Sequence, residues 1–154
     1  MRKLKNLVSF LVNQISTMLA FFKPSSQQNY TDLGLLVLRI FVFIMLIPHG
    51  YDKLLSFLDG ANDFPDPLHV GVRFSHFMTI LGEVFIPLLL IFGLFTRIAA
   101  VIEIGLFLVI AFVIHGSDPF GDKEHALLYL VPSLALLLTG AGKYSLDAAL
   151  FQKK

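Results

Sequence analysis

Residues 33–48 read LGLLVLRIFVFIMLIP, a run in which Arg39 is the only charged residue. The residues that follow, HGYDKLLSFL, are compatible with continued helix to about Leu58. A helix needs about 20 mostly apolar residues to cross the roughly 30 Å hydrocarbon core of a bilayer. This segment therefore predicts a membrane-spanning helix over about residues 33–57.

The composition of the whole chain agrees with a membrane protein. Of its 154 residues, 56% are hydrophobic and 15% are charged, whereas a typical soluble domain is about 25% charged. A soluble monomer of this length could not bury so much apolar surface. The net charge of +1 provides no electrostatic footprint for nucleic acid. Because the chain has no cysteine, disulfide and thiolate chemistry are excluded.

Three further apolar runs are long enough to be spans, and Pro87 and Pro132 lie inside two of them. Proline is tolerated in membrane helices because neighbouring helices and water satisfy the freed carbonyl. We therefore predict an all-α, integral membrane four-helix bundle over residues 31–150, followed by a basic tail at 151–154. The additional spans are expected at about residues 74–95, 97–115 and 124–140.

The first 30 residues have a different pattern. Between Leu7 and Phe22, apolar residues recur at helical spacing opposite polar ones, which predicts an amphipathic helix lying at the membrane interface, joined by a short polar linker. A cleaved signal peptide is the alternative because the start is basic. However, Asn13 and Gln14 interrupt the apolar run, and no small-residue cleavage site follows.

Basic residues predict the orientation of the chain, because short cytoplasmic loops carry an excess of Lys and Arg. With four spans, both termini lie on one side of the membrane. That side would hold Arg2, Lys3, Lys5, Lys23, Arg97, Lys143, Lys153 and Lys154, against Lys53, Arg73 and Lys123 on the other. We therefore expect both termini to be cytoplasmic and the outer mouth, where most carboxylates fall, to be acidic.

Arg39, Glu83 and Glu103 lie inside the predicted spans, where an unpaired charge costs several kcal/mol. At about 1.5 Å per residue, Arg39 and Glu103 both lie roughly 9 Å from the cytoplasmic ends of their helices. We expect them to form a structural ion pair, with a mechanistic role as the alternative. Glu83 has no cation at its own depth, so it should be protonated, hydrogen-bonded to a neighbouring helix, or facing a polar cavity.

The histidines all fall in the outer half of the predicted bundle. His49, His115 and His125 stand at the ends of three different spans, His76 opens the second span, and His69 lies in the loop before it. Imidazoles beside carboxylates suit a proton relay, a quinone headgroup pocket or a metal site. Two histidines on facing helices would also suit a haem. The alternative is that these side chains simply lie among the lipid headgroups.

Candidate site residues follow from this convergence. The spacing of the histidines matches no metal-ligand motif, so no metal ligands are assigned. Tyr129 is included because its ring could stack on a quinone, although aromatic residues in membrane bundles more often serve packing. Candidate catalytic residues are His49, Glu83, Glu124 and His125. Candidate cofactor-binding residues are His49, His115, His125 and Tyr129.

Five motifs, taken in order, resemble the DoxX-like family of small bacterial four-helix membrane proteins. They are LRIFVFIMLIPHGYDKL (38–54), LGE (81–83), GLFTRIAA (93–100), DPFGDKEHALLYL (118–130) and GAGKYSLDAAL (140–150). The resemblance implies an inner-membrane protein with cytoplasmic ends and a link to quinone-dependent or oxidative-stress complexes. The family's polar positions correspond here to His49, Gly50, Lys53, Glu83, Arg97 and Glu124.

Two functional hypotheses remain open. The first is the membrane subunit of a quinone-linked oxidoreductase, which would need a partner subunit because the chain has no visible electron carrier. A quinone is the favoured cofactor, ahead of haem or metal. The second is a non-catalytic membrane scaffold that recruits a partner through the amphipathic segment or the acidic outer loop. A small transporter would require oligomerisation, because four short helices leave little room for two moving halves.

Overall fold

The computed structural model describes residues 5–6, 9–14 and 28–151, among which there is no strand. The chain divides into two units, residues 1–30 and 31–154, which are considered separately. In the first unit, the described residues 5–6 and 9–14 are helical, and Phe10 and Leu11 are exposed. The remainder of the expected amphipathic segment lies outside the described residues.

The first predicted span consists of two helices, α2 (Gln28–Ile44) and α3 (Ile47–Leu58), separated by a two-residue turn. Pro48 lies in the first turn of α3. Proline has no N–H to donate to the carbonyl four residues earlier, and its ring clashes with that carbonyl, here the one of Ile44. The regular helix therefore ends at Ile44 and begins again at Ile47.

The second span also changes geometry along its length. It contains α4 (Val72–Ile80), a π-helical turn η1 (Leu81–Phe85) and α5 (Ile86–Phe92). The Ile86 N–H donates to the Leu81 carbonyl, five residues earlier. Pro87 cannot donate to the Glu83 carbonyl, which leaves that carbonyl without its α-helical partner. The widened turn at this point places Glu83 in the middle of η1.

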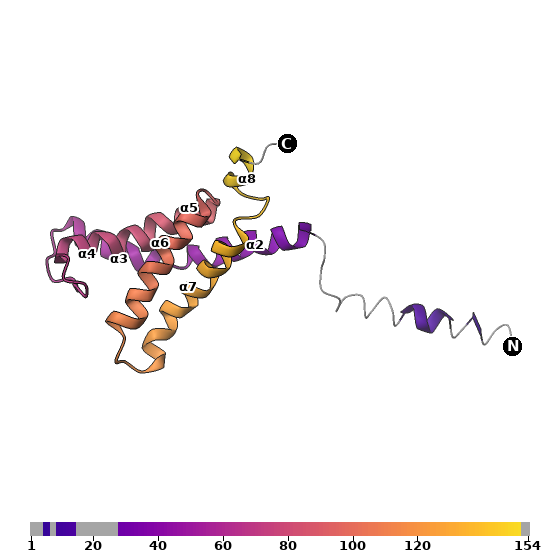
Figure 1. Ribbon diagram of the computed structural model, residues 1–154, viewed down its shortest axis with the longest axis horizontal. Helices are drawn as coiled ribbons and strands as arrows, with labels where there is room; N and C mark the ends of the chain where they lie inside the picture. Colours follow the sequence, from indigo (N-terminus) through magenta and orange to yellow (C-terminus); the bar gives the residue numbers. More distant parts are fainter. Residues whose placement is uncertain (1–4, 7–8, 15–27, 152–154) are drawn as a thin grey trace. The chain divides into compact units, whose positions relative to one another are not determined.

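The remaining helices are α6 (Thr96–Val109), the π-helical turn η2 (Ile110–Ile114), α7 (Phe120–Thr139) and the short α8 (Leu146–Phe151). The most extensive packing is between α6 and α7, which lie side by side (Figure 1). α5 also packs on α6, and α3 packs on both α4 and η1. Phe43, Leu90 and Leu136 are fully buried in the shared core.

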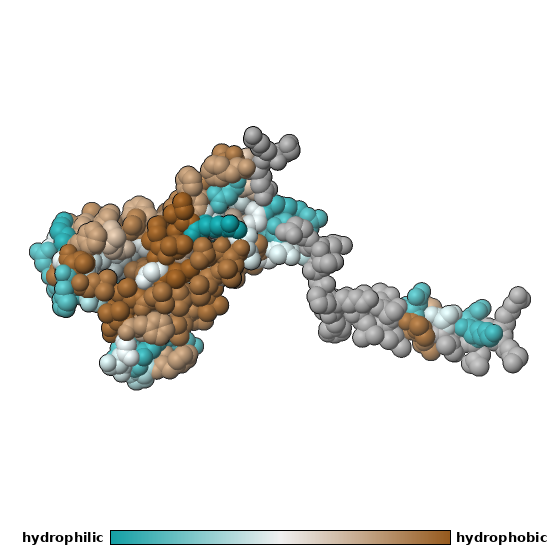
Figure 2. Space-filling view, in the orientation of Figure 1, coloured by the Kyte–Doolittle hydropathy of each residue, from teal (hydrophilic) through white to brown (hydrophobic). Residues whose placement is uncertain are grey.

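Three helices in the described part of the chain are long and apolar enough to cross a membrane. They are Asn29–Leu58, Val72–Phe92 and Thr96–Ile114. α7 has 20 residues, but its first turns contain Asp122, Lys123 and Glu124. Hydrophobic side chains cover much of the surface of α6 and α7, whereas hydrophilic ones gather at the loops that follow α3 and η2 (Figure 2). The described residues thus form an all-helical structure with three candidate membrane-spanning helices.

Candidate functional site

A polar cavity of about 280 Å³ lies among α3, η1, α6–η2 and α7. It brings together side chains from segments that are far apart in the sequence. Three histidines, a tyrosine and three charged groups contribute to its wall. The lining residues are Leu46, His49, Lys53, Glu83, Phe107, Ile110, His115, Asp122, His125, Ala126 and Tyr129.

The central feature of this cavity is an ion pair between Lys53 and Glu83. The Lys53 ammonium donates to both carboxylate oxygens of Glu83, one of them at 2.6 Å. The Glu83 side chain is only 5% exposed, while that of Lys53 is 32% exposed. An opposite charge in contact offsets the cost of burying a carboxylate. Glu83 is therefore hydrogen-bonded to a neighbouring helix and also faces a polar cavity, which are two of the environments expected for it.

Gly50 allows α3 to approach η1 closely enough for this ion pair. Gly50 is buried, and a Cβ atom at this position would lie 2.6 Å from a Val84 methyl group and 2.9 Å from the Glu83 backbone carbonyl carbon. Only a residue without a side chain fits such an approach. Lys53 lies one helical turn beyond Gly50, so the contact positions its ammonium group over Glu83.

The geometry of η1 also contributes to the site. Isolated π-helical turns inside α-helices are rare and occur frequently at functional sites. Glu83 occupies the centre of η1, and Ile110, at the start of η2, lines the same cavity. Both π-helical turns in the described residues therefore contribute to the cavity wall.

The structure separates the five histidines into different environments. His49, His115 and His125 line the polar cavity, and His115 Nδ1 is 2.9 Å from an Asp118 carboxylate oxygen. His76 does not join them: it is buried, its Nε2 lies 2.9 Å from the Lys53 carbonyl, and its ring stacks on Phe64 at a centroid distance of 4.1 Å. His69 is an exposed loop residue with a positive φ of 53°.

Glu124 is not among the residues that line the cavity. On α7, Asp122, His125, Ala126 and Tyr129 follow one another at helical spacing and share the face that lines it. Glu124 lies off this face and is exposed. Of the residues predicted from sequence, the structure thus brings together His49, Glu83, His115, His125 and Tyr129.

The expected ion pair between Arg39 and Glu103 is not formed, and the prediction was wrong in that respect. Both residues are fully buried, but Arg39 donates to the carbonyls of Leu90, Ile91 and Tyr144. The last carbonyls of a helix have no partner within it, and the guanidinium satisfies two of these at the end of α5. Glu103 has no hydrogen-bond partner at either carboxyl oxygen. The equal depth expected from the sequence did not bring the two side chains together.

Sequence reasoning missed the pairing of Lys53 with Glu83. Lys53 was assigned to the outer loop side, so Glu83 was expected to have no cation at its depth. The sequence did contain one signal for it. His49 and Lys53 are four residues apart and therefore share a face of one helix, so Lys53 lies on the same face as a candidate site residue. Within the described residues, no three His, Asp or Glu side chains are grouped so that they could hold a metal ion.

Comparison with known proteins assigns the family. The DoxX family profile matches residues 34–116, and the chain belongs to the DoxX family. It is 30% identical over 128 residues to the inner membrane protein YqjF of Escherichia coli, covering 79% of this chain and 95% of YqjF. The family and this relative indicate a bacterial inner-membrane protein.

Two uncharacterized proteins of Haemophilus influenzae are also similar to this chain. One is 30% identical over 125 residues, which cover 76% of this chain and 83% of the relative. The other is 34% identical over 139 residues, which cover 82% of this chain and 97% of the relative. No solved structure matches the chain significantly.

Proposed function

We propose that this chain is the membrane subunit of a quinone-linked redox complex and that its polar cavity receives a quinone headgroup. The observation that carries the proposal is the convergence of His49, His125 and the Lys53–Glu83 pair on one cavity in a membrane protein. A cavity of about 280 Å³ is slightly smaller than the usual 300–1,000 Å³ of small-ligand sites, which suits a headgroup better than a whole ligand.

The lining residues match the chemistry of such a headgroup. Quinone reduction takes up two electrons and two protons, so a site needs donors to carbonyl oxygens and groups that transfer protons. The partly exposed ammonium of Lys53 is a donor. His49 and His125 place imidazole rings in the cavity wall, and imidazole is the side chain that most often transfers protons in enzyme sites. Glu83 accepts hydrogen bonds from the Lys53 ammonium. The electrons would come from a partner subunit.

The proposal includes a membrane arrangement. We place α7 across the membrane as a fourth span, with its charged first turn at the interface, so that α2–α3, α4–α5, α6 and α7 form a four-helix bundle. Both termini would then be cytoplasmic, as the distribution of Lys and Arg favours. The first 30 residues would lie along the cytoplasmic interface as an amphipathic helix. The polar cavity would open near the outer face.

Ligand-induced stabilisation provides a direct test. Purified protein is titrated with decylubiquinone and with a short-tailed naphthoquinone while its thermal unfolding is followed. A ligand present at 100 times its dissociation constant stabilises the folded state by about 2.7 kcal/mol. We expect the melting temperature of the native chain to rise, and the rise to be lost in His49→Ala and Lys53→Met.

Glu124→Gln is the matched control, because Glu124 is exposed and does not line the cavity. It should retain the full stabilisation by quinone. The proposal fails if neither quinone raises the melting temperature of the native chain. It also fails if His49→Ala and Lys53→Met respond to quinone as the native chain does.

A membrane scaffold is the second candidate function, and the buried contacts of Arg39 favour it. Three backbone carbonyls converge on this one side chain, an arrangement that holds helices together without contributing to the polar cavity. If the chain is a scaffold, His49→Ala and Lys53→Met should each lower the thermal stability of the protein and should lower its abundance in the membrane to a matching degree. Quinone should have no effect on either property.

A further inference from the structure

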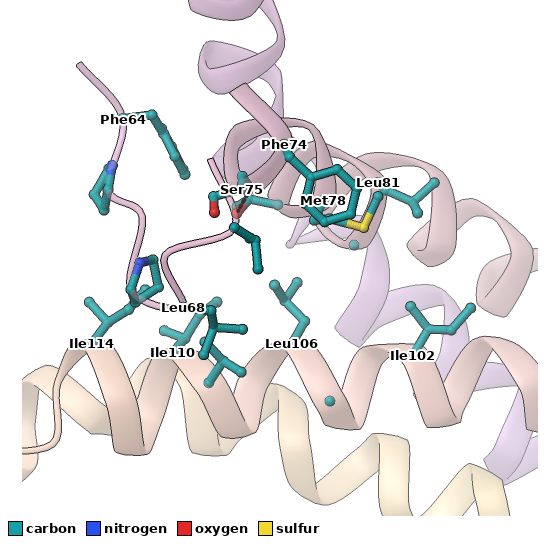
Figure 3. A pocket seen from close by; sticks show the side chains of 17 residues that line it. Phe64, Leu68, Phe74, Ser75, Met78, Leu81, Ile102, Leu106, Ile110 and Ile114 are labelled. Carbon is teal, nitrogen blue, oxygen red and sulfur yellow. Dashed lines mark hydrogen bonds between the residues drawn. The ribbon is translucent and has the colours of Figure 1, made fainter. Parts of the chain in front are cut away.

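A second cavity, of about 250 Å³, lies between α4–η1 and α6–η2 and is almost entirely apolar. Figure 3 shows Phe74, Met78 and Leu81 on one wall and Ile102, Leu106 and Ile114 on the other. The loop before α4 closes one end through Phe64 and Leu68.

This cavity is distinct from the polar one. Leu106 and Ile114 line the apolar cavity, whereas the next residues in the chain, Phe107 and His115, line the polar cavity. Successive residues of a helix point in different directions, so the two cavities occupy different faces of α6–η2. Among the residues that the structure describes, Ile110 alone contributes to both walls.

The apolar cavity offers no free polar side chain to a ligand. Ser75 and Thr79 are the hydroxyl-bearing residues in its wall. The Ser75 hydroxyl donates to an Asp66 carboxylate oxygen at 2.7 Å, and the Thr79 hydroxyl donates to the Ser75 carbonyl at 3.0 Å. None of the described residues that line the cavity is charged. An occupant without polar groups is therefore favoured over a headgroup or a water-soluble substrate.

The cavity wall is continuous with the hydrophobic exterior of the membrane spans. Phe74, Ile102 and Ile114 line the cavity and are 54%, 42% and 40% exposed, respectively. All three belong to helices that are long and apolar enough to cross a bilayer. Because these residues border both the cavity and the exposed apolar surface of the helices, hydrocarbon would surround the opening if these helices span a bilayer.

Two sets of contacts fix the loop that closes one end of this cavity. Phe64 stacks on His76 with an interplanar angle of 4°, and the Asp66 carboxylate accepts hydrogen bonds from the Val70 and Gly71 amides. From Ile102 to Ile114 the wall extends over roughly 18 Å at 1.5 Å per residue. This length is close to one leaflet of a hydrocarbon core about 30 Å thick.

We propose that this cavity binds one acyl chain of a bilayer phospholipid. The chemistry of the wall, its continuity with the lipid-facing surface and its one-leaflet length all fit a single hydrocarbon chain. The headgroup would remain outside in the interfacial layer. This inference does not rest on quinone binding, because a headgroup in the polar cavity contacts a different face of α6–η2.

Photocrosslinking tests the site. The native chain is reconstituted in vesicles containing phosphatidylethanolamine with a diazirine in the middle of one acyl chain, and labelled residues are identified by peptide mass spectrometry. We expect Met78 and Leu106 in the cavity to be labelled several-fold more than Val101 and Phe112. The latter two are more than half exposed and do not line the cavity.

Gly105→Leu would fill the cavity from within. Gly105 lines the cavity, and a Cβ atom there would meet no atom within 4 Å. The variant should cause a several-fold loss of labelling at Met78 and Leu106 without changing it at Phe112. Gly34→Leu is the matched control, because its Cβ also enters open space and Gly34 does not line the cavity.

Several results would overturn the proposal. In the native chain, one is labelling of Met78 and Leu106 no stronger than that of Val101 and Phe112, a comparison that does not depend on any variant folding. Another is unchanged labelling in a Gly105→Leu protein with native thermal stability. Native mass spectrometry that finds an isoprenoid quinone, lost in Gly105→Leu, in place of a phospholipid would assign the cavity to a different occupant.

Discussion

At the scale of single residues, the geometry of the polar cavity depends on a glycine. Gly50 has no Cβ, and α3 therefore approaches the Glu83 backbone so closely that Lys53 reaches the Glu83 carboxylate. Lys53 and Glu83 carry the opposite charges of the ion pair. The short distance between α3 and η1 that lets them meet is set by Gly50, one helical turn before Lys53. A cavity lined by histidines would lose its central ion pair if the two helices moved apart.

Gly50→Ala should therefore separate Lys53 from Glu83. Its Cβ would lie 2.9 Å from a backbone atom of Glu83, and overpacking of this kind costs about 1–3 kcal/mol. We expect a lower melting temperature and weaker quinone-induced stabilisation, both measured by thermal unfolding of purified protein. Gly34→Ala, at an open helical position, should remain as stable as the native chain. A Gly50→Ala protein with native stability would contradict the proposed role.

At the scale of elements, the α5–α6 turn joins two helix termini. Side chains from distant segments form hydrogen bonds with the backbone carbonyls and amides at these termini. Arg39 donates to carbonyls at the end of α5. The Asp147 carboxylate accepts hydrogen bonds from the Phe95 and Thr96 amides, at 2.7 and 2.9 Å, at the start of α6. Positive groups at helix C-termini and negative groups at N-termini also complement the helix dipole.

Asp147→Ala should weaken the start of α6. The substitution leaves two amides at this helix terminus without their acceptor, and loss of a capping side chain costs about 0.5–2 kcal/mol. Hydrogen exchange at Phe95 and Thr96 should accelerate, while exchange within α3 should be unchanged. Asp122→Ala, in the first turn of another helix, serves as the comparison. Equal protection of Phe95 in the native chain and in Asp147→Ala would exclude the capping role.

The loop before α4 is expected to depend on pH through Asp66. The Ser75 hydroxyl, together with the Gly71 and Val70 amides, lowers the pKa of the Asp66 carboxyl. Because these hydrogen bonds lower the pKa of Asp66 in the folded state, they stabilise the folded loop. This stabilisation is fully present above the ordinary pKa of an Asp side chain, about 3.9. It is lost as the pH falls through the lower folded-state pKa.

Hydrogen exchange at Val70 and Gly71 should report this loss, once corrected for the intrinsic pH dependence of exchange. Protection should be constant between pH 7 and 5 and should fall at acidic pH. In Asp66→Ala, protection should be low and independent of pH throughout. A native protein in which the two amides remain equally protected through the acidic range would contradict this assignment. Asp63→Ala, in the same loop, provides the control.

At the scale of the whole molecule, α6–η2 separates two cavities of opposite character. One contains the Lys53–Glu83 pair and three histidines, and the other is almost wholly apolar. In a membrane, a polar cavity can receive a headgroup or protons, whereas an apolar one can receive hydrocarbon. The two proposed ligands therefore act on different faces of a single helix.

The absence of cysteine in the chain makes the proposed topology simple to test. A single cysteine at Lys123, in the first turns of α7, should react with a membrane-impermeant maleimide added to intact spheroplasts. A cysteine at Lys143, beyond the end of α7, should react only after the membrane is permeabilised. If α7 does not cross the membrane, both positions will show the same accessibility. Reversed accessibility would place the termini outside.

The sequence alone predicted an all-helical membrane protein because hydropathy and chain length are local properties of each segment. It also identified five residues that the structure places around one cavity, since histidines at helix ends on the same side of a bundle are confined to a small region. The helix Thr96–Ile114 begins and ends within one residue of the range expected for the third span, 97–115, whereas the helix Asn29–Leu58 begins four residues before the expected first span. Membrane thickness and helical rise are sufficient to place such elements.

Which buried polar groups meet was decided by the tertiary structure. The sequence predicts matching depths for Arg39 and Glu103, but Arg39 contacts backbone carbonyls that only the packing of α5 and the 140–147 segment brings to it. Glu83 has no partner in its own helix and acquires Lys53 through the close approach at Gly50. Depth in a membrane can be read from sequence position, whereas rotation about the helix axis and interhelical distance depend on packing between distant segments.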